Sequence, residues 1–445
     1  MRFPAAPCIA LACLATAAAA NPADPSDPLV AQASRRHDEL ISQGFNFTQG
    51  LSLSLSLSSS PSSPSSPIKR ELLVPGSDGE TVIALWFETA QGELAVQLTG
   101  PRGEVIASWR GRAGEQRITR VLAPGKYVVE VSGAAGRGVI GVKGAVIGTC
   151  ALDPKRVTEH AAAPERGFAW PYLLALPKQV TARALLVLPN NTGFATDDLG
   201  LVRASAACQL AQELALADRL GTPVLMPLFP RPPAPAPGGE NLYLHALTRA
   251  SLAAKAQPVA RVDLQLIAMI DHARAALAKQ GHALGPRVLI SGFSAAGSFA
   301  NRFAVLHPDR TLASAVGSPG GWPLAPVAAE GPDRLPYPVG IADVASLAGA
   351  PVDLAALQQV RFFFFLGAGD GNDAVIFRDS FSASDEALVM RAFGKTPVAR
   401  WTAAQRLYQR AKLDAKFQLY PGVAHAVTPE IRRDIAAAFA AALAR

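Results

Sequence analysis

The sequence predicts an α/β fold with a doubly wound, mostly parallel sheet, preceded by a small all-β sandwich of jelly-roll type. Two patterns support this prediction. From about residue 165 to the C-terminus, apolar runs of strand length alternate with amphipathic runs of helix length, which is typical of a parallel sheet covered by helices. Between residues 70 and 148, short alternating strands follow one another with Gly, Pro and Asp turns and no helical pattern, as in a β-sandwich.

Residues 1–20 have the features of a cleavable targeting segment. Arg2 supplies a positive charge, an apolar run follows, and consecutive alanines offer a cleavage site near residue 20. We therefore expect an exported protein, periplasmic or extracellular. Cys13 suggests lipid attachment as a less favoured alternative, because Ala10 stands where a bulky aliphatic residue is usual. No later stretch has the roughly 18 unbroken apolar residues of a membrane helix, so we expect no integral membrane span.

Residues 21–69 are rich in Ser, Pro and Leu and are expected to form a low-complexity linker. Ser-Pro repeats cannot bury a core and favour flexible, partly extended chain. The Leu-Ser alternation at 51–58 has the period of a strand and could pair as one. We nevertheless assign the whole stretch to the linker.

The predicted β-sandwich spans residues 70–148 and contains no catalytic constellation, so binding, folding support and spacing remain open roles. Its expected strands lie at residues 81–87, 94–98, 105–109, 117–121 and 126–131.

The predicted α/β domain spans residues 165–445. Its expected strands lie at residues 185–188, 223–228, 312–316, 362–366 and 417–420, with a further strand beginning at Val288. Helices are expected at 201–220 and 262–277, directly after Ser294, and after Pro429. Two long irregular stretches, 229–257 and 317–355, are expected to form walls or a lid over a pocket, since long loops in compact domains usually serve function.

The strand from Val288 runs directly into Gly-Phe-Ser294-Ala-Ala-Gly and then into an alanine-rich helical run. A serine at such a turn has a strained backbone and an exposed hydroxyl. It also lies at a helix N-terminus, whose free N–H groups can bind an oxyanion. The motif is G-x-S-x-A, one methyl group larger at its last position than the usual form. A plain packing turn is the alternative interpretation.

An acid and a histidine follow further strands in the order that a catalytic serine requires. Asp370 follows the strand at 362–366, and Asp373, three residues on, is the alternative acid. His425 follows the strand at 417–420 and precedes a helix capped by Thr428 and Pro429. Open α/β sheets bind their ligands at the carboxyl ends of their strands, where these candidates would lie.

These residues resemble the α/β-hydrolase superfamily, and the stretch GFSAAGSFANRF is most similar to polyhydroxybutyrate-depolymerase and feruloyl-esterase-like serine hydrolases. The resemblance covers roughly residues 170–445. It implies that Ser294 is the nucleophile, His425 the general base and acid, and Asp370 the group that orients the histidine. It also implies an acyl-enzyme mechanism without a cofactor.

The oxyanion hole of such enzymes takes one N–H from the residue after the nucleophile, here Ala295, and one from a loop after an earlier strand. Backbone N–H groups of Asn191 or Thr192, which follow the strand at 184–188, are the candidates for the second donor. An ordinary Asn-Gly-type turn is the alternative. His245 precedes the serine, out of order for a triad, and a structural role is favoured over pocket lining.

Composition limits the possible functions. Of 445 residues, 49% are hydrophobic and 17% charged, which indicates a globular protein with a large core. The net charge of +7 comes from scattered basic residues and implies no nucleic-acid partner. No H-E-x-x-H, paired C-x-x-C, P-loop or G-x-G-x-x-G motif indicates a metal or nucleotide.

The sequence thus predicts an exported carboxylic-ester hydrolase acting on an ester or polymeric acyl substrate. A polyester depolymerase or peptidase of the same fold is one alternative. A catalytically inactive binding protein is another. The oligomeric state is not indicated.

Removal of the leader leaves two cysteines, Cys150 and Cys208. In an oxidising compartment they could form a disulfide between the segment entering the α/β domain and its first long helix. Two buried free thiols are the alternative, and the sequence does not decide between them.

Overall fold

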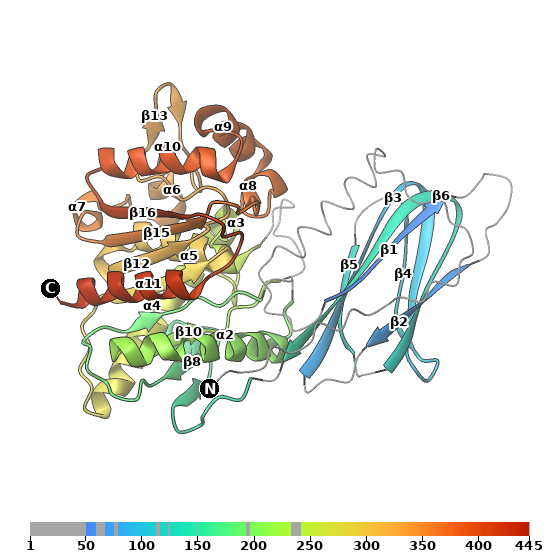
Figure 1. The fold of residues 1–445 in the computed structure, drawn as a ribbon, viewed down its shortest axis with the longest axis horizontal. Helices are drawn as coiled ribbons and strands as arrows, with labels where there is room; N and C mark the ends of the chain where they lie inside the picture. Colours follow the sequence, from blue (N-terminus) through green and yellow to red (C-terminus); the bar gives the residue numbers. More distant parts are fainter. Residues whose placement is uncertain are drawn as a thin grey trace.

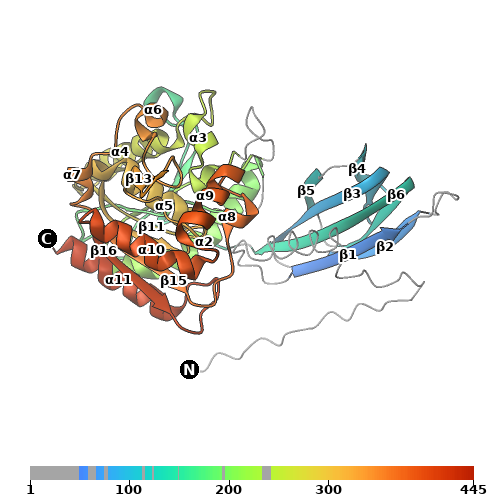
Figure 2. The ribbon, with the colours of Figure 1, turned by 90° about the horizontal axis from the view of Figure 1, so that it is seen from above.

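The structure, a computed structural model, describes residues 50–58, 67–74, 79–112, 116–122, 125–148, 150–192, 196–232 and 242–444. The expected targeting segment with Cys13, and most of the expected linker, lie outside these residues. The described chain forms an all-β part and, beside it, a larger α/β part, as both views show (Figures 1 and 2).

Six strands of the all-β part pair antiparallel in one hydrogen-bonded sheet. They are β1 (Gly50–Ser58), β2 (Ile68–Val74), β3 (Gly79–Thr99), β4 (Val105–Arg112), β5 (Gln116–Leu122) and β6 (Gly125–Gly148). The long strands β3 and β6 pair along most of their length. β1 and β5 flank one end of this ribbon, and β2 and β4 flank the other. The register shifts between Thr89 and Glu93, where a bulge separates the two ends.

Two expectations for this part need correction. Residues 51–58, which we assigned to the linker, belong to strand β1 and pair with β6 from Arg137 to Gly144. This pairing was not predicted, because the predicted strand ended at residue 131 while β6 continues through the glycine-rich stretch to Gly148. The strands expected at 81–87 and 94–98 are one continuous strand, β3.

The α/β part has an eight-stranded mixed sheet. In spatial order its strands are β7 (Val157–His160), β8 (Tyr172–Ala175), β10 (Val224–Pro227), β9 (Leu186–Val187), β11 (Val288–Phe293), β12 (Thr311–Gly317), β15 (Arg361–Gly367) and β16 (Asp414–Tyr420). β8 is antiparallel to both of its neighbours, and the six strands from β10 to β16 are parallel. The α/β class is therefore confirmed, although β7 places the start of the sheet before residue 165.

Helices cover both faces of this sheet (Figures 1 and 2). The strand β15 shows why, because its successive phenylalanines point to opposite faces. Phe363 and Phe365 pack with α2 (Leu199–Leu220) and α11 (Pro429–Leu443) in one buried cluster. Phe362 and Phe364 pack with α4 (Val262–Lys279), α5 (Ala295–Leu306) and α10 (Pro397–Arg410) in the other. The helices expected after Ser294, after Pro429 and at 201–220 and 262–277 are thus confirmed.

A few short elements occur within the described parts of the two long stretches that were expected to be irregular, 229–257 and 317–355. The remaining elements are η1 (Pro164–Arg166), η2 (Leu244–Ala246), α3 (Arg249–Ala253), η3 (Pro308–Arg310), β13 (Ala329–Glu330), β14 (Asp333–Arg334), α6 (Val344–Ala348), α7 (Leu354–Leu357), α8 (Ala374–Phe377) and α9 (Ala383–Phe393). Throughout the described ranges, every helix is too short or too polar to cross a lipid bilayer.

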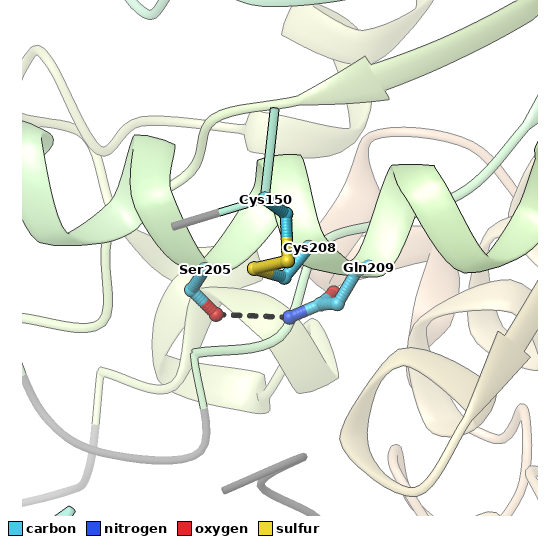
Figure 3. Close-up of a disulfide and its surroundings, with 4 residues drawn as sticks. All are labelled: Cys150, Ser205, Cys208 and Gln209. Carbon is cyan, nitrogen blue, oxygen red and sulfur yellow. Dashed lines mark hydrogen bonds between the residues drawn. A yellow bond between two sulfur atoms is a disulfide. The ribbon is translucent and has the colours of Figure 1, made fainter. Parts of the chain in front are cut away.

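A disulfide joins Cys150 to Cys208 (Figure 3). Cys150 follows β6 directly after the all-β part, and Cys208 lies in the middle of α2. The bond closes a loop over 58 positions of sequence. Of the two possibilities that the sequence left open, the structure has the disulfide.

Candidate active site

Ser294 occupies a sharp turn between β11 and α5, with φ 60° and ψ −127°. This is a strained conformation for a residue with a side chain. Two glycines make room for the turn. A Cβ on Gly292 would lie 2.0 Å from the carbonyl oxygen of Ala296, and one on Gly297 would lie 2.2 Å from that of Gly317 in β12. The close approach of α5 to the sheet therefore falls at Gly297, and the motif accommodates a methyl group at Ala296.

His425 and Asp370 form a hydrogen-bonded pair on the loops after β16 and β15. His425 Nδ1 lies 2.9 Å and 3.1 Å from the two carboxylate oxygens of Asp370. A carboxylate partner fixes the proton on Nδ1, which leaves the lone pair on Nε2 available. The ring of Phe293 lies 4.5 Å from the imidazole and limits its movement.

The Asp370 carboxyl is ionised at neutral pH despite being only 4% exposed. Burial by itself would raise the pKa of Asp370. Hydrogen bonds from His425, the Ser318 hydroxyl and the backbone N–H of Asn372, together with the charge interaction with His425, outweigh burial and hold this pKa below its usual range. The carboxylate can therefore orient the imidazole and stabilise its protonated form.

Asn372 was missed by the sequence analysis, and it touches both Ser294 and His425. Its Nδ2 lies 3.0 Å from His425 Nε2 and 3.4 Å from Ser294 Oγ. Among the described residues, no direct hydrogen bond links Ser294 Oγ to His425 Nε2. The only sequence signal for Asn372 was its position between the two candidate acids.

Asp373, the alternative acid, faces away from the histidine. Its side chain is buried and pairs with Arg400 Nη1 of α10 at 2.7 Å, and it also caps α8 by accepting from the Val375 N–H at 3.2 Å. Arg400 is itself fully buried and donates to the Gly394 carbonyl at 2.8 Å. Geometry thus favours Asp370 as the partner of His425, and gives Asp373 the task of anchoring the same loop.

The loop after β9 holds the two expected oxyanion donors. The Asn191 N–H donates to Gln209 Oε1 of α2 at 3.1 Å, and Gln209 Nε2 donates back to the Asn191 carbonyl. Asn191 stays a predicted donor, and in this structure its N–H is engaged by Gln209. Thr192 is buried next to the undescribed residues 193–195 and stays a candidate. Ala295 is the first residue of α5, where a backbone N–H has no partner within the helix.

A cavity of about 330 Å³ opens onto Ser294 and His425. It lies between α2, α11 and the edge of the large sheet. Its apolar lining includes Leu188, Met226 and Phe365, and its polar lining includes Gln209 and Arg432. In the part of the chain that is described, no group of three or more His, Cys, Asp or Glu side chains is arranged to hold a metal ion.

His245 is a buried structural residue. Its Nε2 donates to the Phe229 carbonyl at 2.7 Å. Burial, assisted by the nearby charge of Arg231, lowers the pKa of His245 to about 3 against the opposing effect of the Phe229 hydrogen bond. The imidazole is therefore neutral, and it is hydrogen-bonded to Phe229 rather than to the serine.

No protein-family model matches the chain, and no curated protein matches it either. Solved structures do. Poly(aspartic acid) hydrolase-1 from Sphingomonas sp. KT-1 is 18% identical over 66% of this chain and 100% of its own, with a TM-score of 0.43. An S-formylglutathione hydrolase from Agrobacterium tumefaciens is 14% identical over 65% and 94%, with a TM-score of 0.36. A ferulic acid esterase is 14% identical over 65% and 97%, with a TM-score of 0.34. Over about two thirds of its length, the chain is thus similar to solved structures of hydrolases and esterases.

Proposed function

We propose that this chain is an exported serine hydrolase that cleaves carboxylic esters through an acyl-enzyme on Ser294. The observation that carries the proposal is the strained Ser294 beside the hydrogen-bonded pair of His425 and Asp370. All three follow parallel strands and meet at one edge of the sheet, next to a cavity. Strain at a polar residue is usually retained where function needs it.

In the proposed mechanism, Ser294 Oγ attacks the ester carbonyl carbon while His425 Nε2 takes the hydroxyl proton. Asp370 holds the imidazole through Nδ1 and stabilises its positive charge. The N–H of Ala295, with a second donor from the Thr192 loop, binds the developing oxyanion. The tetrahedral intermediate expels the alcohol, which receives the proton from Nε2. Water then enters, loses a proton to Nε2 and attacks the acyl carbon. The second tetrahedral intermediate breaks its bond to Ser294 Oγ, which takes the proton back from Nε2 as the carboxylic acid leaves.

The remaining domain organisation belongs to the same proposal. Residues 1–20 act as an export signal, and the all-β part acts as a β-sandwich accessory domain. Two features support this arrangement. The Cys150–Cys208 disulfide suits an oxidising compartment outside the cytoplasm, and the bulge in the β3–β6 ribbon divides its flanking strands into two groups that could form two layers.

A catalytically inactive binding protein is the competing proposal, and one observation favours it. The amide nitrogen of Asn372 contacts both His425 Nε2 and Ser294 Oγ, and it takes the Nε2 lone pair that a bond from Ser294 would need. A protein in which this arrangement were permanent would have the residues of a triad without their activity.

A fluorophosphonate probe tests the proposal, since it modifies only an activated serine. We expect labelling at Ser294, located by peptide mass spectrometry, and complete loss of labelling in Ser294→Ala. Ser298→Ala, which alters another buried serine four residues along α5, is the matched control and should label normally.

Unlabelled wild-type protein would favour the binding protein. A panel of p-nitrophenyl esters and peptide anilides then tests the reaction. Ester cleavage should exceed amide cleavage, and the reverse would make the protein a peptidase.

A further inference from the structure

The side chain of Asn372 contacts both the nucleophile and the general base of the proposed mechanism. Its Nδ2 is 3.0 Å from His425 Nε2 and 3.4 Å from Ser294 Oγ. A carboxamide nitrogen carries two hydrogens and accepts none. One nitrogen can therefore donate to the base and to the nucleophile at the same time.

This arrangement blocks the first proton transfer. The lone pair of His425 Nε2 accepts from Asn372, so it cannot accept from Ser294. A general base must lie within about 2.6–3.2 Å of the atom whose proton it takes, and here the hydrogen-bond partner of Nε2 is the Asn372 amide. The Ser294 hydroxyl accepts from the amide and gains no basic partner.

We propose that Asn372 is a latch on the nucleophile, which keeps Ser294 and His425 apart in the free protein and is displaced when an acyl substrate enters. The inference rests on the proposed function and adds a specific resting state to it. Displacement leaves the Nε2 lone pair free to accept the serine proton. The amide, once released, has two donors that can bind oxygen atoms of the substrate.

The backbone around Asn372 indicates how the latch opens. On one side, the Asn372 N–H donates to Asp370 Oδ1 at 2.9 Å. On the other side, Asp373 is held by its buried ion pair with Arg400. Gly371 faces open space, and Asn372 itself is only partly buried. Opening therefore requires rotation of the Asn372 side chain, while the loop stays in place and keeps Asp370 against His425.

The latch should slow acylation by a measurable factor. Opening gives up the hydrogen bonds from Asn372 Nδ2 to His425 Nε2 and Ser294 Oγ. One typical intramolecular hydrogen bond changes an equilibrium constant by a factor of up to about ten. We therefore expect removal of the amide to accelerate acylation about five- to tenfold.

The test compares acylation rates of the full-length protein and its variants. Asn372→Ala removes the amide, and Asn372→Ser serves as a second variant whose short hydroxyl cannot reach both partners. Gln358→Ala is the matched control. Gln358 precedes β15, and its side-chain amide donates to the Ala411 carbonyl. The change therefore lies at the amino ends of the strands, whereas Ser294 lies at their carboxyl ends. Two rates are measured, the second-order rate of fluorophosphonate labelling at Ser294 and the pre-steady-state burst with p-nitrophenyl acetate.

The latch predicts that both Asn372 variants acylate about five- to tenfold faster than the wild type and the Gln358 control, with melting temperatures close to wild type. Equal or slower acylation in the variants would overturn the latch, and slower acylation would give Asn372 an assisting role instead. The proposed function survives either of these results, because the wild type still labels at Ser294. Absence of labelling in every protein overturns both the latch and the proposed function.

Discussion

The ion pair between Arg400 and Asp373 allows a direct test of how stable the loop after β15 is, the loop that carries Asp370 and Asp373. The guanidinium and carboxylate are 2.7 Å apart and almost fully buried. At an effective dielectric constant of 20, two unit charges at this distance attract by about 6 kcal/mol. Desolvation offsets much of that attraction. Removal of one partner nevertheless costs about 3–5 kcal/mol, because the other charge is left buried and unpaired.

We therefore expect Arg400→Met to lower the free energy of unfolding by about 3–5 kcal/mol. Urea titrations followed by tryptophan fluorescence and circular dichroism measure this loss. The double variant Arg400→Met, Asp373→Asn should lose less unfolding free energy than the sum of the losses in the two single variants, since the two residues interact directly. Arg391→Met is the matched control, because it breaks the exposed pair with Asp333, and pairs of that kind contribute about 0–1 kcal/mol.

A loss below about 1 kcal/mol in Arg400→Met, or strictly additive effects in the double variant, would refute this reasoning. The same variant should also lose esterase activity. Asp373 is three residues from Asp370, so release of its anchor loosens the loop that holds His425. An active enzyme with a destabilised fold would show that the anchor and the active site are independent.

Four further perturbations have defined outcomes. Reduction of the disulfide, or Cys208→Ser, should lower the unfolding free energy by about 4 kcal/mol. This is the stabilisation expected from closing a loop over 58 positions in the unfolded chain. Identical urea midpoints with and without reductant would contradict it. Gln209→Ala should lower kcat with little change in KM, because Gln209 holds both backbone groups of Asn191 and so positions the loop with the predicted oxyanion donors. Gln358→Ala, which lies away from the cavity, should leave kcat unchanged. Asp370→Asn should lower kcat by up to about 10⁴-fold through the wrong histidine tautomer, and a loss below tenfold would remove Asp370 from the triad. Since the pKa of Asp370 lies below its usual range, its stabilising effect is present above about pH 4 and is lost as pH falls through the lowered pKa, so acid should destabilise wild type more than Asp370→Asn.

The α/β architecture was predictable because strong local patterns encode it. Four consecutive phenylalanines in β15 can only be a strand buried on both faces, and the structure places them alternately in the two cores. The turn at Ser294 was likewise predictable from its flanking glycines, because a side chain at Gly292 or Gly297 would collide with the adjacent backbone. Strands β7 and β8 were not predicted, because four-residue strands are too short to have a recognisable period.

The contacts that surround the candidate triad were not predictable, because distant residues make them. Asp370 and Asp373 share one turn, and only Arg400, 27 positions away, separates their roles. Gln209 could not be singled out among the polar residues of its long helix, because its contact with Asn191 exists only in the folded chain. Asn372 has no motif of its own, and its role follows from the meeting of three loops.

The cross-link between Cys150 and Cys208 also decides how tension passes through the molecule. If the all-β part is held on a surface, a pull transmitted along β6 reaches the sulfur bridge two residues after that strand ends. From there it enters the centre of α2 and bypasses residues 151–207. The edge strand β7 and its neighbour β8 lie within the bypassed segment, so this end of the large sheet is shielded from the pull.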